Sequence, residues 1–119
     1  MKYLILLYAE EGAWPPDEHR IALQRSIDLC HELNAEGKYV SAAPLQPIST
    51  AVSVRVRDGK TYITDGPFAE TKEHLGGYFL VDVANLDEAI RVASQIPGAT
   101  RGTAEVRPIV ELDSLPTRS

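Results

Sequence analysis

The spacing of hydrophobic residues along this chain predicts six strands and two helices. Residues 2–8 and 78–83 are nearly continuous apolar runs, which are typical of strands buried on both faces. Residues 51–57 alternate instead, so we expect their valines to point inward and their serine and arginines outward. Asp58-Gly59 then predicts a hairpin turn, because a type I′ turn needs two positive φ angles. The complete set of predicted strands is 2–8, 39–43, 51–57, 61–64, 78–83 and 105–110.

The first predicted helix runs from Pro16 to about Glu36. Proline suits the first helical position, and Gly37 is well placed to end the helix in the left-handed conformation. Its expected apolar stripe is Leu23, Ile27, Cys30 and Leu33.

The second predicted helix follows Asn85, which forms a plausible capping pair with Glu88. Pro97-Gly98 ends it. Its expected apolar face is Leu86, Ala89, Ile90, Ala93 and Ile96.

This order of elements predicts an α+β fold of the ferredoxin-like, split βαβ type with an added β-hairpin. Two helices cover only one face of such a sheet. Because the other face is also rich in apolar residues, we expect a homodimer that hides it by face-to-face packing.

Length and charge narrow the class of protein. The chain has 119 residues, 44% of them hydrophobic, which predicts one domain over residues 1–113 and a frayed tail over 114–119. A net charge of −5 argues against nucleic-acid binding, and Arg55, Arg57 and Lys60 are interpreted as a solvated strand face. One cysteine and an N-terminal apolar run too short to cross a membrane predict a cytoplasmic protein without membrane association.

Residues 65–78 are the most informative segment, because a polar loop with a Gly-Pro turn precedes an apolar strand. Asp65 has two interpretations that the sequence leaves open. Its carboxylate could cap backbone N–H groups and fix the turn. It could also act as a general acid or base at the edge of a cleft.

Glu70 and His74 lie four residues apart, so one helical turn would bring them together as a carboxylate–histidine pair. An extended segment would separate them. Lys72 could hold an anionic substrate or pair with Glu70. Gly76-Gly77 favours a bulge at the entry to the next strand.

Aromatic residues suggest where a small molecule would bind. Tyr8, Trp14, Tyr78 and Phe68 are candidates for lining a pocket, with ordinary packing as the alternative. Cys30 is interpreted as a core residue. His19, His31 and His74 have no recognised ligand spacing, so we predict no metal and no cofactor.

Several blocks resemble the YCII-related family, in particular its DGPF-containing branch. They include Val54-Arg55-Val56-Arg57-Asp58-Gly59-Lys60, Thr64-Asp65-Gly66-Pro67-Phe68-Ala69-Glu70-Thr71-Lys72-Glu73, Leu75-Gly76-Gly77-Tyr78 and Val106-Arg107-Pro108. The resemblance implies a dimeric α+β barrel. The wider superfamily includes isomerases, lyases and monooxygenases that act on small aromatic or quinone-like molecules, often without a cofactor. It also implies similarity to proteins that accompany sigma factors. Shorter relatives are thought to use a His–Asp pair, with the histidine near the start of the first helix. His19 lies near that start but without the family's local spacing, and His31 lies three turns later, so this pair is not carried over to the chain.

Two functional hypotheses follow. In the first, the chain binds or converts a small anionic or aromatic compound by proton transfer, with Asp65 moving a proton, His74 or Glu70 assisting, and Lys72 holding negative charge. In the second, it is a dimeric regulatory module without catalysis, whose partner is a protein related to sigma factors.

Overall fold

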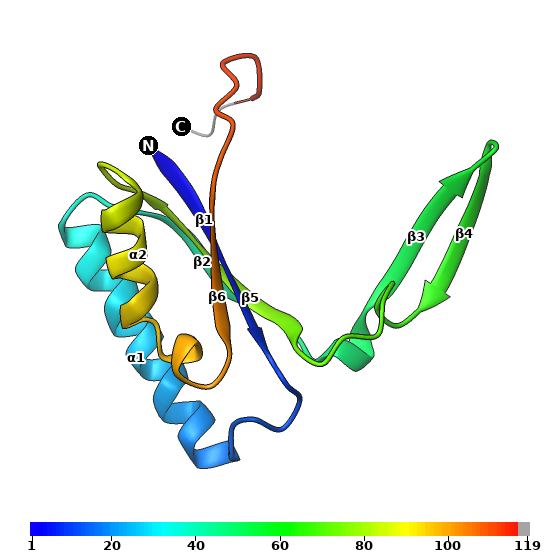
Figure 1. The fold of residues 1–119 in the computed structure, drawn as a ribbon, viewed down its shortest axis with the longest axis horizontal. Coiled ribbons are helices and arrows are strands. Elements are labelled where there is room, and N and C mark those ends of the chain that lie inside the picture. Colours follow the sequence, from blue (N-terminus) through cyan, green and yellow to red (C-terminus); the bar gives the residue numbers. More distant parts are fainter. Residues whose placement is uncertain (117–119) are drawn as a thin grey trace.

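The computed structural model describes residues 1–116 and is built around one antiparallel four-stranded sheet (Figure 1). Its strands are β1 (Lys2–Ala9), β2 (Tyr39–Pro44), β5 (His74–Asp82) and β6 (Thr103–Pro108). Their order across the sheet is β2-β5-β1-β6, and every neighbouring pair is antiparallel. This order and the mixed composition confirm the predicted ferredoxin-like α+β fold.

Helices α1 (Pro16–Ala35) and α2 (Leu86–Gln95) lie on the same face of this sheet (Figure 1). The predicted helix ends are confirmed. Pro16 starts α1, and Gly37 follows its end with φ 74°. At α2, the Glu88 backbone N–H donates to Asn85 Oδ1 at 3.0 Å, as the capping pair predicts. Short 3₁₀ turns occur at Ile48–Thr50 and Pro97–Thr100.

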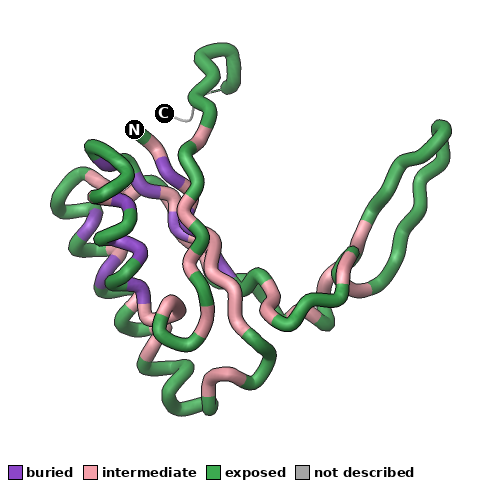
Figure 2. Tube along the Cα trace, viewed as in Figure 1, coloured by how far each residue is buried: buried purple, intermediate pink, exposed green. Residues whose placement is uncertain are grey.

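The hydrophobic core lies between the helices and this face of the sheet, where the buried segments cluster (Figure 2). Alternate residues of β1 and β5 point into it, as the pleat requires. The buried residues are Tyr3, Ile5, Leu29, Leu33, Phe79, Val81, Val83, Ala89, Val92, Ala93 and Ile96. Cys30 packs against this cluster, and burial raises the pKa of its thiol.

The predicted helix stripes were partly wrong. Ile27 is exposed and Leu29 is buried in its place. Ile27 lies six residues before Leu33, which turns it about 120° around the helix from that buried position. In α2, Leu86 and Ile90 are exposed and Val92 is buried. Ile90 lies two residues before Val92, which turns it about 160° around the helix from that buried position, whereas Leu86 is the first residue of the helix.

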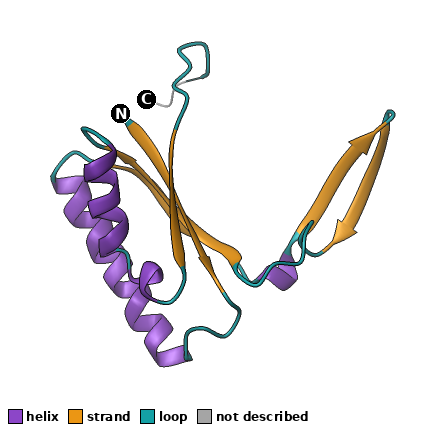
Figure 3. Ribbon diagram, in the orientation of Figure 1, coloured by secondary structure: helices purple, strands orange, loops and turns teal. Residues whose placement is uncertain are grey.

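Strands β3 (Val52–Arg57) and β4 (Lys60–Asp65) form a separate two-stranded hairpin that stands away from the main body (Figure 3). We call it the arm. The predicted turn is confirmed, with φ 52° at Asp58 and 75° at Gly59. We expected the β3 valines to point inward, and this expectation is wrong, because Val52, Val54 and Val56 are all exposed in the protomer. Period-two alternation shows that one strand face is apolar, but it does not show what covers that face.

Strand β5 begins at His74, four residues before the predicted start. Leu7 pairs with Gly77 and Tyr8 with Leu75, so Gly76 is the extra residue of a bulge, as predicted. At the other end of the chain, residues 112–115 form a turn, in which the Leu115 N–H donates to the Leu112 carbonyl. The rest of the tail that we expected to fray, residues 117–119, lies outside the described residues. Among residues 1–116, no helix has the length and apolar character needed to cross a membrane.

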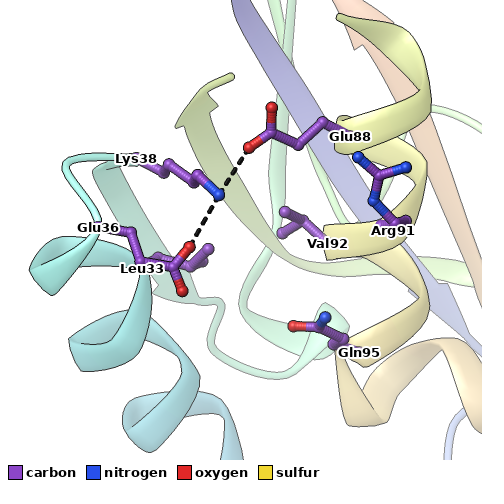
Figure 4. A pocket seen from close by; sticks show the side chains of 7 residues that line it. All are labelled: Leu33, Glu36, Lys38, Glu88, Arg91, Val92 and Gln95. Carbon is purple, nitrogen blue, oxygen red and sulfur yellow. Dashed lines mark ion pairs between the residues drawn. The ribbon is translucent and has the colours of Figure 1, made fainter. Parts of the chain in front are cut away.

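An ion-pair bridge joins the two helices near their upper ends. Lys38 Nζ lies 2.8 Å from Glu36 Oε2 and 2.7 Å from Glu88 Oε1 (Figure 4). These hydrogen bonds to Glu36 and Glu88 raise the pKa of Lys38. The bond from Lys38, helped by the Ala84 N–H, holds the pKa of the Glu88 carboxyl below its ordinary value.

The substitution Glu88→Gln is expected to destabilise the fold near neutral pH but not in acid. Because folding lowers the pKa of Glu88, its carboxylate contributes stability above its ordinary pKa of about 4.3. That contribution disappears as the pH falls through the folded value. Urea unfolding of both proteins across this range measures the difference, with Glu32→Gln on the exposed side of α1 as the control. A difference that stayed constant down to acid pH would contradict this role.

Candidate functional site

The loop after β4 is braced by Ser53. Gly66 has φ 97°, its N–H donates to the Ala51 carbonyl at 2.7 Å, and Ser53 Oγ donates to the Gly66 carbonyl at 2.8 Å. These bonds fix the turn from the hairpin base. Asp65 instead pairs across the strands with Val52, and its carboxylate has no hydrogen bond or ion pair within residues 1–116. The interpretation of Asp65 as the residue that caps this turn is therefore wrong, because the side chain that stabilises the turn is Ser53.

One face of the arm and the following loop border an open hollow of about 340 Å³. Alternation places Ser53, Arg55 and Arg57 on this face of β3, and the hairpin register brings Tyr62 and Thr64 of β4 beside them. The Gly66 turn then adds the loop residues to its edge. The residues lining the hollow are Ser53, Arg55, Arg57, Tyr62, Thr64, Pro67 and Phe68.

Two guanidinium groups and two aromatic rings are the chemically distinctive part of this hollow. Arg57 Nη1 donates to the carbonyl of Val56 at 2.9 Å, while Arg55 has no carboxylate partner within residues 1–116. Phe68 is 79% exposed. Cations without carboxylate partners beside exposed rings are suited to a ligand that is both anionic and aromatic.

His74 lies in a different place, at the start of β5 opposite Ala9 of β1. Its Nδ1 is 3.3 Å from Thr71 Oγ1, and Thr71 Oγ1 itself donates to the Glu73 carbonyl at 2.6 Å. Glu73 Oε1 accepts from Thr103 Oγ1 at 2.8 Å. These contacts of the Thr71 and Thr103 hydroxyls connect the loop to β6. A structural role therefore explains why Thr71, Glu73 and His74 lie together.

The proposed pairing of Glu70 with His74 does not form. Residues 66–73 contain no helical turn, so the four-residue spacing does not bring the two side chains together. Lys72 does not pair with Glu70 either. Its Nζ lies 3.4 Å from Glu10 Oε1, and both Lys72 and Glu70 are exposed.

The candidate aromatic residues are spread over the molecule. Tyr78 shares a 2.7 Å hydrogen bond with Ser41, and Tyr8 lies at the end of β1. Trp14 stacks against Arg101, whose guanidinium carbon is 4.5 Å from the ring centre. Only Phe68 of the four lines the hollow on the arm.

The residues that the sequence left out are Arg55, Arg57 and Tyr62. The sequence does indicate that the two arginines lie together, because they alternate with valines and must therefore share a strand face. It was interpreted as a solvated surface because Tyr62 and Phe68 join that face only through the hairpin register and the Gly66 turn.

A second hollow, of about 140 Å³, lies beside Lys38 and Glu88 (Figure 4). Its lysine is already paired with two carboxylates, those of Glu36 and Glu88. Within residues 1–116, no three His, Cys, Asp or Glu side chains come together in a way that could hold a metal ion.

Comparison with known proteins supports one family. Residues 1–113 match the family model described as the YCII-related domain. The chain is also 37% identical over 114 residues to a protein of Rhizobium meliloti (strain 1021), covering 92% of each chain. That protein is described as uncharacterized, so it brings no substrate with it.

Proposed function

The chain belongs to the YCII-related family, and from that premise we propose that it binds a small aromatic anion in the hollow on its arm. The observation that supports this function is the combination of Arg55 and Arg57 with Tyr62 and Phe68 around one hollow. A volume of about 340 Å³ falls in the range of small-molecule sites.

Each part of such a ligand would have a matching group in the hollow. A guanidinium binds a carboxylate through two parallel hydrogen bonds, which gives both affinity and orientation. Tyr62 and Phe68 offer ring faces and edges to an aromatic body. The hydroxyls of Ser53 and Thr64 lie on the same face, where they could bond a phenolic substituent, although Ser53 already braces the loop.

The proposed function is binding. Asp65, Glu70 and His74 do not line the hollow. For this reason we do not assign proton transfer on the bound compound to them.

A ligand screen tests this function directly. We expect benzoate, salicylate or 4-hydroxybenzoate to raise the melting temperature at low salt, and we expect neutral phenol and benzamide to have little effect. The double variant Arg55→Gln/Arg57→Gln should weaken binding by at least about tenfold, because each charge-assisted hydrogen bond contributes about 1.5–3 kcal/mol. Isothermal titration calorimetry measures the change.

The double variant Arg20→Gln/Arg25→Gln is the matched control. Both arginines are exposed on α1, so this variant removes the same two charges away from the arm. Equal weakening by the control would indicate a general charge effect and contradict the site. If none of the aromatic acids bound, the binding function would be wrong and the regulatory-module hypothesis would be favoured.

A further inference from the structure

The cations of the arm lie on one face and follow one another toward its tip. Arg55 is directly opposite Tyr62, and Arg57 is directly opposite Lys60. Alternation places the two arginines on the same side of β3, about 6.8 Å apart along the strand. Lys60 and Tyr62 are also two residues apart, so both project from this face of β4. Lys60 is not among the residues that line the hollow, and it therefore continues the cationic face just beyond it.

Arg57 and Lys60 are a like-charged pair without an acidic partner. Directly opposite side chains have Cβ atoms about 5 Å apart, and like charges in this position destabilise the strand pairing. Within residues 1–116, none of the three cations of the arm forms an ion pair. Asp65 does not offset them, because it pairs with Val52 on the opposite face, and Asp58 occupies the turn. An anion bound beside Arg57 and Lys60 would relieve their repulsion.

The other end of the same face is aromatic and uncharged. Phe68 follows the Gly66 turn, which Ser53 holds at the base of the arm. Tyr62 lies between this base and the tip. The two arginines are the only charged residues among those that line the hollow. An aromatic ring held between Tyr62 and Phe68 would therefore have both cationic positions on the side that faces the tip.

We propose that the hollow binds an aromatic dianion whose two anionic groups lie on the same side of its ring. Arg55 binds the first group, and Arg57 together with Lys60 binds the second. The guanidinium groups offer parallel hydrogen bonds to a carboxylate, and the Lys60 ammonium adds a flexible point charge at the second position. This inference rests on the proposed function and adds to it the number and the placement of the charges on the ligand.

Three aromatic acids test the placement of the charges. Isophthalate has two carboxylates on one side of its ring, terephthalate has them at opposite ends, and benzoate has one. By isothermal titration calorimetry at low salt, we expect isophthalate to bind about tenfold more tightly than benzoate, because it gains charge-assisted hydrogen bonds at the second position. Terephthalate should gain less, since it reaches both cationic positions only if its ring leaves Phe68.

Lys60→Gln tests the second position separately. We expect this variant to lose most of the tenfold advantage of isophthalate while its affinity for benzoate stays unchanged. Retained benzoate binding also shows that the arm of the variant is intact. Lys72→Gln is the matched control, because Lys72 is exposed, pairs with Glu10 and does not line the hollow. It should leave both affinities unchanged.

The outcomes separate this inference from the function on which it rests. If benzoate bound but isophthalate bound no more tightly, the proposed function would stand and the second anionic position would be wrong. An equal gain for terephthalate, or an equal loss of both compounds in Lys60→Gln, would also overturn the inference. If none of these acids bound to the wild-type protein, the proposed function would fail, and this inference with it.

Discussion

Ile96→Ala is expected to lower the free energy of unfolding by about 2–5 kcal/mol, as truncations of fully buried isoleucines do. Ile96 is 1% exposed at the end of α2 and belongs to the hydrophobic core. The substitution removes three carbon atoms from a closely packed site and leaves a cavity that the surrounding structure can only partly fill. Because a domain of this size has a total stability of about 5–15 kcal/mol, this would be a large fraction of it.

Ile90→Ala is the matched control for that experiment. Ile90 lies in the same helix but is 50% exposed, so little apolar surface returns to water when it is truncated. We expect a change of about 0.5 kcal/mol or less. Equilibrium urea unfolding, followed by circular dichroism, compares the two variants. Similar losses for both would mean that the two sides of α2 have been assigned incorrectly.

Gly102→Ala is expected to be nearly as damaging, for a steric reason. A Cβ atom at residue 102 would overlap the carbonyl oxygen of Tyr8, far inside the 3.0 Å that real Cβ atoms respect. That oxygen belongs to the backbone, so the clash is relieved only if β1 and the start of β6 move apart where Tyr8 pairs with Thr103. Overpacking of this kind costs about 1–3 kcal/mol, and more when a sheet must shift.

Gly98→Ala tests whether the cost comes from this clash. The atoms nearest to a Cβ at residue 98 would all belong to the Leu7 side chain, at 3.7–3.9 Å, which is ordinary van der Waals contact. We therefore expect the free energy of unfolding to stay unchanged, or to rise by about 0.4–1 kcal/mol because the unfolded chain is stiffer.

Trp14 is the only tryptophan and stacks on Arg101, next to Gly102. Its fluorescence should change in Gly102→Ala and stay constant in Gly98→Ala, and a change in both variants would argue against a local clash.

Much of the fold could be predicted because its determinants are local. Proline at the start of α1, the Asn85 cap and the Asp58-Gly59 turn each fix the backbone through nearby atoms, and all three were found where the sequence placed them. The helix faces were less well predicted. A spacing of three or four residues allows several stripes, and only packing against the sheet selects Leu29 over Ile27.

The candidate site was harder to predict because its parts come from different segments. The sequence singled out Phe68, which lines the hollow. The arginines acquire their neighbours only when β3 and β4 pair in register and Gly66 turns the chain back. Glu70 and His74 were linked by an assumed helical turn, and the loop adopted none. The family was identified because its motifs cover almost the entire chain, but the name of a family does not place side chains around a ligand.

The separate hairpin also divides the chain into two units that can open independently. Strands β2 and β5 are neighbours in the main sheet, and the arm is inserted between them in the sequence. The ladder of β3 and β4 joins only these two strands, so breaking it leaves every pairing of the main sheet intact. Amide hydrogen exchange in a single protomer would therefore fall into two cooperative groups, a rapidly exchanging arm and a protected sheet. Anything that binds either face of the arm would slow the first group without changing the second.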